Sequence, residues 1–301
     1  MTSAGEASES ELSPFRRRRV ALPARGGEMA VLEAGPSDRP VDLVFVHANG
    51  FNARTYRTIL APLARSARVL AADLRGHGLT DLPVRTDGRR SWLDHRDDLR
   101  ALLEAEGVRG AVLSGHSMGG VVCLLAARAA PAAARGLVLF DPVILSPAMT
   151  AAVFAGTMRP FHLVDQALAR RAIFPSREAA LQSYRGRGAF RTWSDEQLDD
   201  YVADGFRPRG DGQVELRCPP EWEASNFRSH AHDCWAALRE TTCPVRIIAA
   251  ELDSPCAAPA HAGELPPDRR VTVEVAPGTS HFIPMERPEL ARDAIKAALD
   301  R

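Results

Sequence analysis

The sequence has few cysteines, no excess of either charge and no long apolar run. Its five cysteines are scattered along 301 residues, an odd number that suits a reducing compartment better than a disulfide framework. No run of eighteen apolar residues occurs, so no membrane-spanning helix is expected. Residues 1–14 are polar and acidic and contain no apolar segment, so no signal peptide is expected. These absences together predict a cytoplasmic protein.

Acidic and basic side chains balance, because 38 of each give a formal net charge of +0. Binding to nucleic acids relies on an excess of basic side chains, so this balance argues against a polyanion as partner. The basic run at residues 16–19 is therefore interpreted as a solvated edge strand. Residues 230–234 combine two histidines, an aspartate and a cysteine, but they lack the spacing of a zinc site. No metal and no cofactor are expected, and the expected partner is a small-molecule substrate.

Apolar segments with strand-like and helix-like patterns alternate along most of the chain. Strands at 18–22 and 28–33 are expected to form a hairpin around a Gly-Gly turn. Further strands are expected at 41–47, 67–72, 110–113, 136–140, 245–250 and 271–276, and helices at 56–64, 94–106, 118–129 and from 233 to 238. This alternation predicts the α/β class, with a mostly parallel central sheet flanked by helices on both faces.

The segment at 113–120 carries the most functional information. It reads Leu-Ser-Gly-His-Ser-Met-Gly-Gly, so a Gly-Xaa-Ser-Xaa-Gly pattern stands between an apolar strand and an apolar helix. In that context Ser117 lies on a sharp turn that exposes its hydroxyl, the arrangement of a nucleophile elbow. Gly115 and Gly119 remove Cβ atoms where strand and helix approach each other. The helix N-terminus also presents free N–H groups to a developing negative charge.

A nucleophilic serine needs a base, and the base needs an acid that orients it. Along the chain these follow in the order serine, acid, histidine. His281 lies in a loop after the last expected strand, and Asp253 follows the strand at 245–250. Sites in open α/β sheets lie at that end of the strands. The predicted triad is therefore Ser117, Asp253 and His281.

Two other acids and one other histidine remain as alternatives. Asp141 directly follows the strand at 136–140, and Glu251 lies next to the favoured position. His261 precedes the last strand, so we expect it on the wrong side of the sheet.

Four motifs together resemble the α/β-hydrolase superfamily, in its branch with a helical cap, and the similarity extends over residues 19–301. Residues 43–50, Leu-Val-Phe-Val-His-Ala-Asn-Gly, resemble the strand and loop of the oxyanion hole. Residues 73–80, Asp-Leu-Arg-Gly-His-Gly-Leu-Thr, resemble the family's Asp-Xaa-Arg-Gly-Xaa-Gly-Xaa-Ser loop. The elbow and the histidine loop at 278–282 complete the set. The resemblance implies the α/β-hydrolase fold with an inserted cap.

Two positions depart from the family's motifs. The usual His-Gly is His47-Ala48 here, so the oxyanion loop can differ in backbone geometry. Thr80 replaces the usual serine, which is a minor change. Relatives that open epoxides or remove halides carry an aspartate at the elbow, so Ser117 favours acyl chemistry.

The resemblance also implies two backbone donors for an oxyanion. The residue after the nucleophile supplies one, which assigns the N–H of Met118. Matching the family's His-Gly-Xaa pattern assigns the other to Asn49, with Phe51 as the near alternative. His47 lies at the strand end within this loop and is interpreted as structural.

Between residues 147 and 232 the alternation of strands and helices stops, and aromatic side chains are frequent. The family inserts its cap at this place. We therefore expect a helical cap at 147–232 on a core of residues 16–146 and 233–301, with residues 1–15 disordered. Some aromatics are expected to line an apolar pocket that faces the nucleophile. The candidates are Phe51, Trp222 and Phe227.

The predicted activity is hydrolysis of an ester-like bond in a small, largely apolar substrate, through a Ser-His-Asp triad and an acyl-enzyme. Fold resemblance alone does not decide the reaction. The same triad could hydrolyse a carbon–carbon bond, transfer the acyl group to an alcohol, or belong to a non-catalytic small-molecule receptor.

Overall fold

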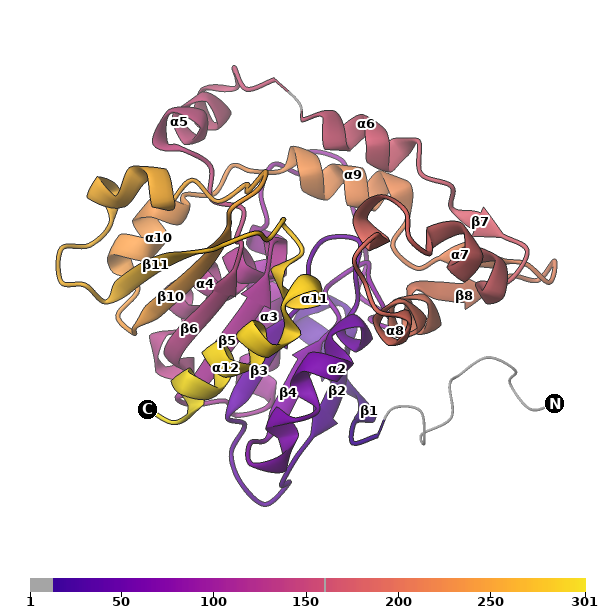
Figure 1. Ribbon diagram of the computed structural model, residues 1–301, viewed down its shortest axis with the longest axis horizontal. Coiled ribbons are helices and arrows are strands. Elements are labelled where there is room, and N and C mark those ends of the chain that lie inside the picture. Colours follow the sequence, from indigo (N-terminus) through magenta and orange to yellow (C-terminus); the bar gives the residue numbers. More distant parts are fainter. Residues whose placement is uncertain (1–12, 160) are drawn as a thin grey trace.

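An eight-stranded sheet forms the centre of the fold in a computed structural model that describes residues 13–159 and 161–301 (Figure 1). The strand order is β1-β2-β4-β3-β5-β6-β10-β11. The strands are β1 (Arg16–Leu22), β2 (Gly27–Ala34), β3 (Leu43–Val46), β4 (Val69–Ala72), β5 (Ala111–His116), β6 (Ala134–Phe140), β10 (Val245–Ala250) and β11 (Val271–Ala276). β2 pairs antiparallel with β1 and β4, whereas every pair from β4 to β11 is parallel. The mostly parallel sheet expected from the sequence is confirmed.

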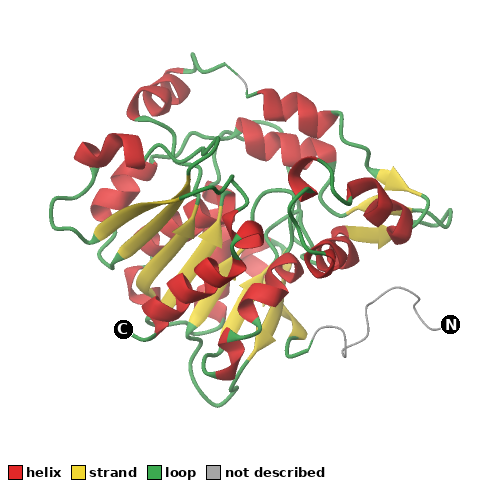
Figure 2. Cartoon of the chain, in the orientation of Figure 1, coloured by secondary structure: helices red, strands yellow, loops and turns green. Residues whose placement is uncertain are grey.

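Helices cover both faces of this sheet (Figure 2). α3 (Leu93–Ala105), α4 (Met118–Ala129) and α10 (Cys234–Glu240) pack on one face. α2 (Arg57–Leu60) and α12 (Pro288–Leu299) pack on the other. The hydrophobic core therefore has two layers with the sheet between them.

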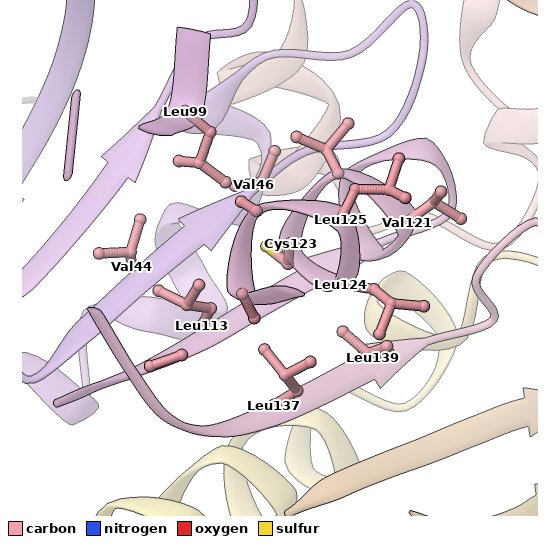
Figure 3. Close-up of a cluster of buried hydrophobic side chains, with 14 of the residues drawn as sticks. Val44, Val46, Leu99, Leu113, Val121, Cys123, Leu124, Leu125, Leu137 and Leu139 are labelled. Atoms are coloured by element: carbon pink, nitrogen blue, oxygen red, sulfur yellow. The ribbon is translucent and has the colours of Figure 1, made fainter. Parts of the chain in front are cut away.

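β3 shows how the sequence supplies both layers. Val44 and Val46 pack with the first group of helices, and Leu43 and Phe45 pack with the second. Successive side chains of a strand point to opposite faces, so a strand that is covered on both sides is apolar throughout. Figure 3 shows part of the first layer, where side chains of α4 lie beside those of the strands beneath it.

Most expected elements are present, and α4, β10 and β11 have the expected bounds. The helix expected at 56–64 is divided into the 3₁₀ turn η2 (Ala53–Tyr56), the short α2, and the turn η3 (Leu63–Arg65). Pro62 lies between the last two and has no N–H with which to continue the helix. The C-terminal helices α11 (Ile283–Glu286) and α12 were not expected from the sequence.

The inserted region between β6 and α10 contains five α-helices among its described residues: α5 (Pro147–Ala155), α6 (His162–Leu168), α7 (Arg177–Tyr184), α8 (Asp195–Gly205) and α9 (Pro220–Arg228). Figure 1 shows α5, α6 and α9 above the ends of the central strands. The region also holds a small sheet that the sequence did not predict, with the order β7-β9-β8. Its strands are β7 (Ile173–Phe174), β9 (Val214–Leu216) and β8 (Phe206–Pro208). The limits 147 and 232 of a separate cap remain a prediction.

Buried ion pairs attach α8 to the core. Asp200 accepts hydrogen bonds at 2.8 Å from the guanidinium groups of Arg54 and Arg57. Asp204, one turn further along α8, pairs with Arg17 of β1 at 2.5 Å. Removing one member of a buried pair leaves an uncompensated charge, so these contacts hold the inserted region to the sheet.

The ordered part of the chain begins before residue 16, where the sequence analysis expected it to begin. Residues 1–12 of the segment expected to be disordered lie outside the described residues. Phe15, which was placed in the same segment, is buried in the core beside β1. β1 is an edge strand, as the basic run predicted, but its arginines are paired with carboxylates such as Glu33, which contacts Arg16 and Arg18.

None of the described helices is long and apolar enough to cross a membrane. All five cysteines are free thiols, and each is buried. Burial raises the pKa of the Cys256 thiol to about 12, which suits an inert core residue rather than a nucleophile.

Candidate active site

The elbow between β5 and α4 places Ser117 at a conformation that most residues avoid. Its φ is 57° and its ψ is −121°, and its backbone N–H donates to the Phe140 carbonyl at 2.9 Å. A Cβ on Gly115 would lie 2.5 Å from the carbonyl carbon of Gly119. A Cβ on Gly119 would overlap the Val46 carbonyl oxygen of β3. The two glycines therefore allow the close packing that holds the serine in this strained turn.

The structure brings Ser117 and His281 together. His281 lies in the loop after β11, and its Nε2 is 2.9 Å from the Ser117 hydroxyl. Ser117 is 6% exposed and the His281 side chain is 25% exposed, so most of the pair is shielded from solvent. This distance allows the imidazole to take the serine proton.

The carboxylate that contacts His281 is that of Asp141, whereas the sequence analysis expected Asp253 in this place. His281 Nδ1 donates to Asp141 Oδ2 at 2.6 Å, and Asp141 is fully buried. Asp253 lines the same cavity but is exposed, and its side chain has no hydrogen bond within the part of the chain that the structure describes. Glu251 is also exposed and bonds to the Gly278 N–H.

The backbone around Asp141 explains this arrangement. Asp141 directly follows β6, has a φ of 41°, and donates its N–H to the Ile248 carbonyl of β10 at 2.7 Å. Its Oδ1 accepts from the Ala250 N–H at 2.8 Å and from the Ser254 hydroxyl at 2.5 Å. The loop after β10 thus contributes a hydroxyl to the acid instead of supplying the acid.

Both predicted oxyanion donors lie at the cavity. Asn49 and Met118 line it, and within the described residues their backbone N–H groups have no hydrogen-bond acceptor. The next N–H, that of Gly50, is directed away and donates to His77 Nε2 at 3.0 Å. Phe51, the alternative donor, gives its N–H to the Ala48 carbonyl at 3.1 Å. Two free N–H groups near one serine are what an oxyanion hole requires.

Contacts with α9 hold the Asn49 side chain. Its amide nitrogen donates to the Glu223 carbonyl at 3.0 Å, and its oxygen accepts from the Asn226 amide at 2.8 Å. Asn226 in turn accepts from His95 at 3.1 Å. The inserted region therefore fixes the loop that carries Asn49, one of the two predicted oxyanion donors. Asn226 lies far from Asn49 in the sequence, so sequence reasoning had no signal for it.

His47 is placed as a structural residue, as the sequence indicated. Its Nδ1 donates to the Ala48 carbonyl at 2.7 Å and its Nε2 accepts from the Leu74 N–H at 2.9 Å. Burial lowers the pKa of His47 to about 3, so the ring is neutral.

A cavity of about 880 Å³ opens in front of Ser117. Most of its lining is apolar and comes from the segment after β6, from α5 and α6, and from the histidine loop. The large apolar members include Val143, Ile144, Leu145, Met149, Phe161, Leu163, Phe190 and Phe282. Phe51 and Phe227, both expected in the pocket, also line it.

Trp222 does not line this cavity, which corrects the third pocket candidate. It is 1% exposed, its indole N–H donates to the Arg75 carbonyl at 2.9 Å, and the Arg89 guanidinium lies 4.4 Å from its ring centroid. Trp222 faces the core side of α9, whereas Phe227 faces the cavity. One helix carries both residues, and the sequence did not show which face each takes.

Arg170 is a polar lining residue that the sequence analysis missed. It pairs with Glu223 at 2.8 Å and bonds to the Tyr201 hydroxyl. The pair places one positive and one negative group together at the wall of the cavity, so its formal charges cancel.

The histidine cluster at 230–234 is not arranged as a metal site. His230 and His232 pack against Trp92, with ring centroids 4.9 and 4.7 Å away, and Asp233 caps α10 by accepting from the Ala236 N–H. Within residues 13–159 and 161–301, no group of three or more histidine, cysteine or acidic side chains could hold a metal ion.

The chain is similar to known proteins in both sequence and fold. A sequence model of the alpha/beta hydrolase family matches residues 43–294. The chain is 28% identical over 267 residues to the 2-(acetamidomethylene)succinate hydrolase of Mesorhizobium japonicum, which covers 86% of this chain and 87% of that protein. A crystal structure of E-2-(acetamidomethylene)succinate hydrolase has a TM-score of 0.74 and 26% identity, covering 95% of this chain and 100% of that one. The 2-hydroxy-6-oxo-2,4-heptadienoate hydrolase of Pseudomonas putida is 34% identical over 127 residues, 42% of this chain and 45% of that protein.

Proposed function

The chain belongs to the alpha/beta hydrolase family, and we propose that it is a serine hydrolase that cleaves an ester-like bond in a small, largely apolar substrate. The observation that carries the proposal is the hydrogen-bonded series from Ser117 through His281 to Asp141 at a mostly apolar cavity. A serine with a base and an orienting acid is the arrangement of nucleophilic acyl transfer.

In this mechanism the Ser117 hydroxyl attacks the carbonyl carbon while His281 Nε2 takes its proton. Asp141 holds the Nδ1–H of the imidazole, which leaves Nε2 free to accept, and it stabilises the imidazolium that forms. The N–H groups of Asn49 and Met118 bind the oxyanion. The imidazolium then gives its proton to the leaving alcohol, and an acyl-enzyme remains. Water, deprotonated by His281, attacks this ester and releases the acid and free Ser117.

The lining supports an uncharged substrate. Arg170 is the only arginine or lysine among the described lining residues, and Glu223 already pairs with it. A substrate carboxylate would have to compete with Glu223 or enter the apolar part of the cavity without a partner. Burying an unpaired charge is costly, so neutral esters are favoured.

The test compares neutral p-nitrophenyl esters of increasing acyl length with esters of the same lengths that end in a carboxylate. We expect turnover of the neutral series, with kcat/KM at least about tenfold above that of the charged partner, since burial of an unpaired charge costs more than about 1.4 kcal/mol. A preference for the charged esters would contradict the assigned substrate class. Binding of the esters without turnover would identify a receptor and refute the hydrolase.

Hydrolysis of a carbon–carbon bond is the second candidate. The observation that favours it is the similarity to a 2-hydroxy-6-oxo-2,4-heptadienoate hydrolase. A panel of vinylogous diketones, followed by loss of their absorbance, separates the two activities. Turnover of a diketone above that of every ester would replace the ester proposal.

A further inference from the structure

His116, the residue before the nucleophile, has both ring nitrogens engaged. It is fully buried at the end of β5. Its Nδ1 lies 2.7 Å from the Tyr56 hydroxyl, and its Nε2 lies 2.7 Å from the backbone carbonyl of His281. Tyr56 is also fully buried, and its hydroxyl oxygen lies 3.2 Å from the Ala48 N–H. Three hydrogen bonds therefore connect three loops of the site.

The direction of each bond follows from the groups involved. A carbonyl oxygen can only accept, so His116 Nε2 carries a proton and donates to His281. Burial lowers the pKa of His116 well below its usual range, so the ring is neutral and Nδ1 is an acceptor. The Tyr56 hydroxyl must then donate to Nδ1, and its oxygen accepts the Ala48 N–H. Burial raises the pKa of Tyr56 well above its usual range, so this hydroxyl keeps its proton.

The hydrogen-bonded series from Ala48 through Tyr56 and His116 to His281 lies next to residues of the proposed reaction at both ends. Ala48 precedes Asn49, whose N–H is a proposed oxyanion donor. His116 precedes Ser117. The carbonyl at the other end belongs to His281 itself, the proposed base. We propose that Tyr56 and His116 are positioning residues, which set the Asn49 N–H and the His281 ring relative to Ser117. This inference rests on the proposed hydrolase function.

These hydrogen bonds have a kinetic consequence, because neither Tyr56 nor His116 is among the described residues that line the cavity. A shift of about 1 Å in a reacting group can cost about 100-fold in rate. Loosening the series is therefore expected to slow the chemical step and to leave substrate binding nearly unchanged. A role in stability alone would instead reduce the number of active molecules.

The test variant is Tyr56→Phe, which removes one hydroxyl and leaves the ring in the core. The control is Ser114→Ala in the same strand as His116, because the Ser114 hydroxyl is also buried but donates only to the Val138 carbonyl. Active sites are counted by titration with a fluorophosphonate, and kcat and KM for a neutral ester are expressed per titrated site. We expect kcat per site to fall about 10- to 100-fold in Tyr56→Phe with KM within about twofold, and to stay near wild type in Ser114→Ala.

A Tyr56→Phe protein with fewer titrated sites but wild-type kcat per site would overturn the inference. If that variant does not fold, His116→Gln and His116→Leu make the same comparison. Gln retains a donor toward the His281 carbonyl and Leu does not, so kcat per site is expected to be higher in Gln, and equal values would also overturn the inference. Failure of the proposed function itself is distinct, because wild-type protein would then show no titratable serine.

Discussion

The two walls of the cavity are built differently. The wall formed by the sheet loops presents Ser117 and His281, which are hydrogen-bonded to each other at 2.9 Å, and the buried Asp141 bonds to His281 at 2.6 Å. The wall from the inserted region presents mainly apolar side chains, and α5 buries none of its residues. Hydrogen bonds are directional, whereas apolar contacts are not. We infer that the first wall determines the chemistry and the second determines which substrates enter.

The largest expected effect concerns Ser117, the proposed nucleophile. Ser117→Ala is expected to reduce kcat by roughly a million-fold, as removal of a triad serine can. The side chain is small and its backbone conformation would remain, so the thermal unfolding midpoint is expected to change little. The measurement is kcat on the best neutral ester together with that midpoint. A variant that retains substantial activity would place the reaction elsewhere.

The carboxylates of Asp141 and Asp253 provide the next comparison. Asp141→Asn is expected to lower kcat by about 10⁴-fold, because an amide favours the wrong tautomer of His281. Asp253→Asn changes an exposed side chain that does not contact His281, so its kcat is expected within about threefold of wild type, given the small effect of surface substitutions. Measuring both variants with one substrate makes each the control of the other. Reversed losses would restore Asp253 as the acid.

His232, which lies between α9 and α10, should make the free energy of unfolding depend on pH. Burial lowers the pKa of His232 to about 3 from the ordinary 6.5, so the unfolded chain binds more protons than the folded protein between these values. The contribution of neutral His232 to the free energy of unfolding is fully present above pH 6.5. It is lost as the pH falls toward 3, by up to about 5 kcal/mol. His232→Gln is expected to flatten the pH dependence of the free energy of unfolding in that window, measured by urea titration. An unchanged slope would refute the assignment.

The two aromatic residues of α9 are expected to have different roles: Trp222 stabilises the fold, and Phe227 determines which acyl chains fit the cavity. Trp222→Ala is expected to cost about 3–5 kcal/mol in the free energy of unfolding, since the indole is buried away from the cavity, and to leave the acyl-length preference unchanged. Phe227→Ala enlarges the cavity, so we expect it to shift the preferred acyl length, by roughly tenfold in relative kcat/KM. The ester series measures both. If only Trp222→Ala shifted the preferred acyl length, Trp222 and not Phe227 would be the residue that determines selectivity.

The parts of the site that depend on short local motifs could be located from the sequence. The glycines at 115 and 119 have a steric purpose that a short motif shows, so Ser117 and α4 could be located from the sequence. The oxyanion loop and the histidine loop follow strands whose apolar pattern is also local.

The carboxylate partner of His281 could not be identified from the sequence. Asp141 and Asp253 both follow strands at the same end of the sheet, and β6 and β10 are neighbours. Both satisfy the order serine, acid, histidine. What distinguishes them is the hydrogen bond of Asp141 to His281 and its bonds to Ala250 and Ser254, each of which joins residues more than a hundred positions apart. The same limit applies to Trp222 and to the Arg170–Glu223 pair, whose environments arise from the packing of the inserted region.

The most direct test of the account is peptide mapping of the protein after reaction with a fluorophosphonate. We expect one adduct, on the peptide that contains Ser117, and no such adduct in Ser117→Ala. We also expect a strongly reduced labelling rate in His281→Ala, because the hydroxyl then lacks its base. An adduct on another serine, or equal labelling rates in wild type and His281→Ala, would contradict the assignment of Ser117 as the activated nucleophile.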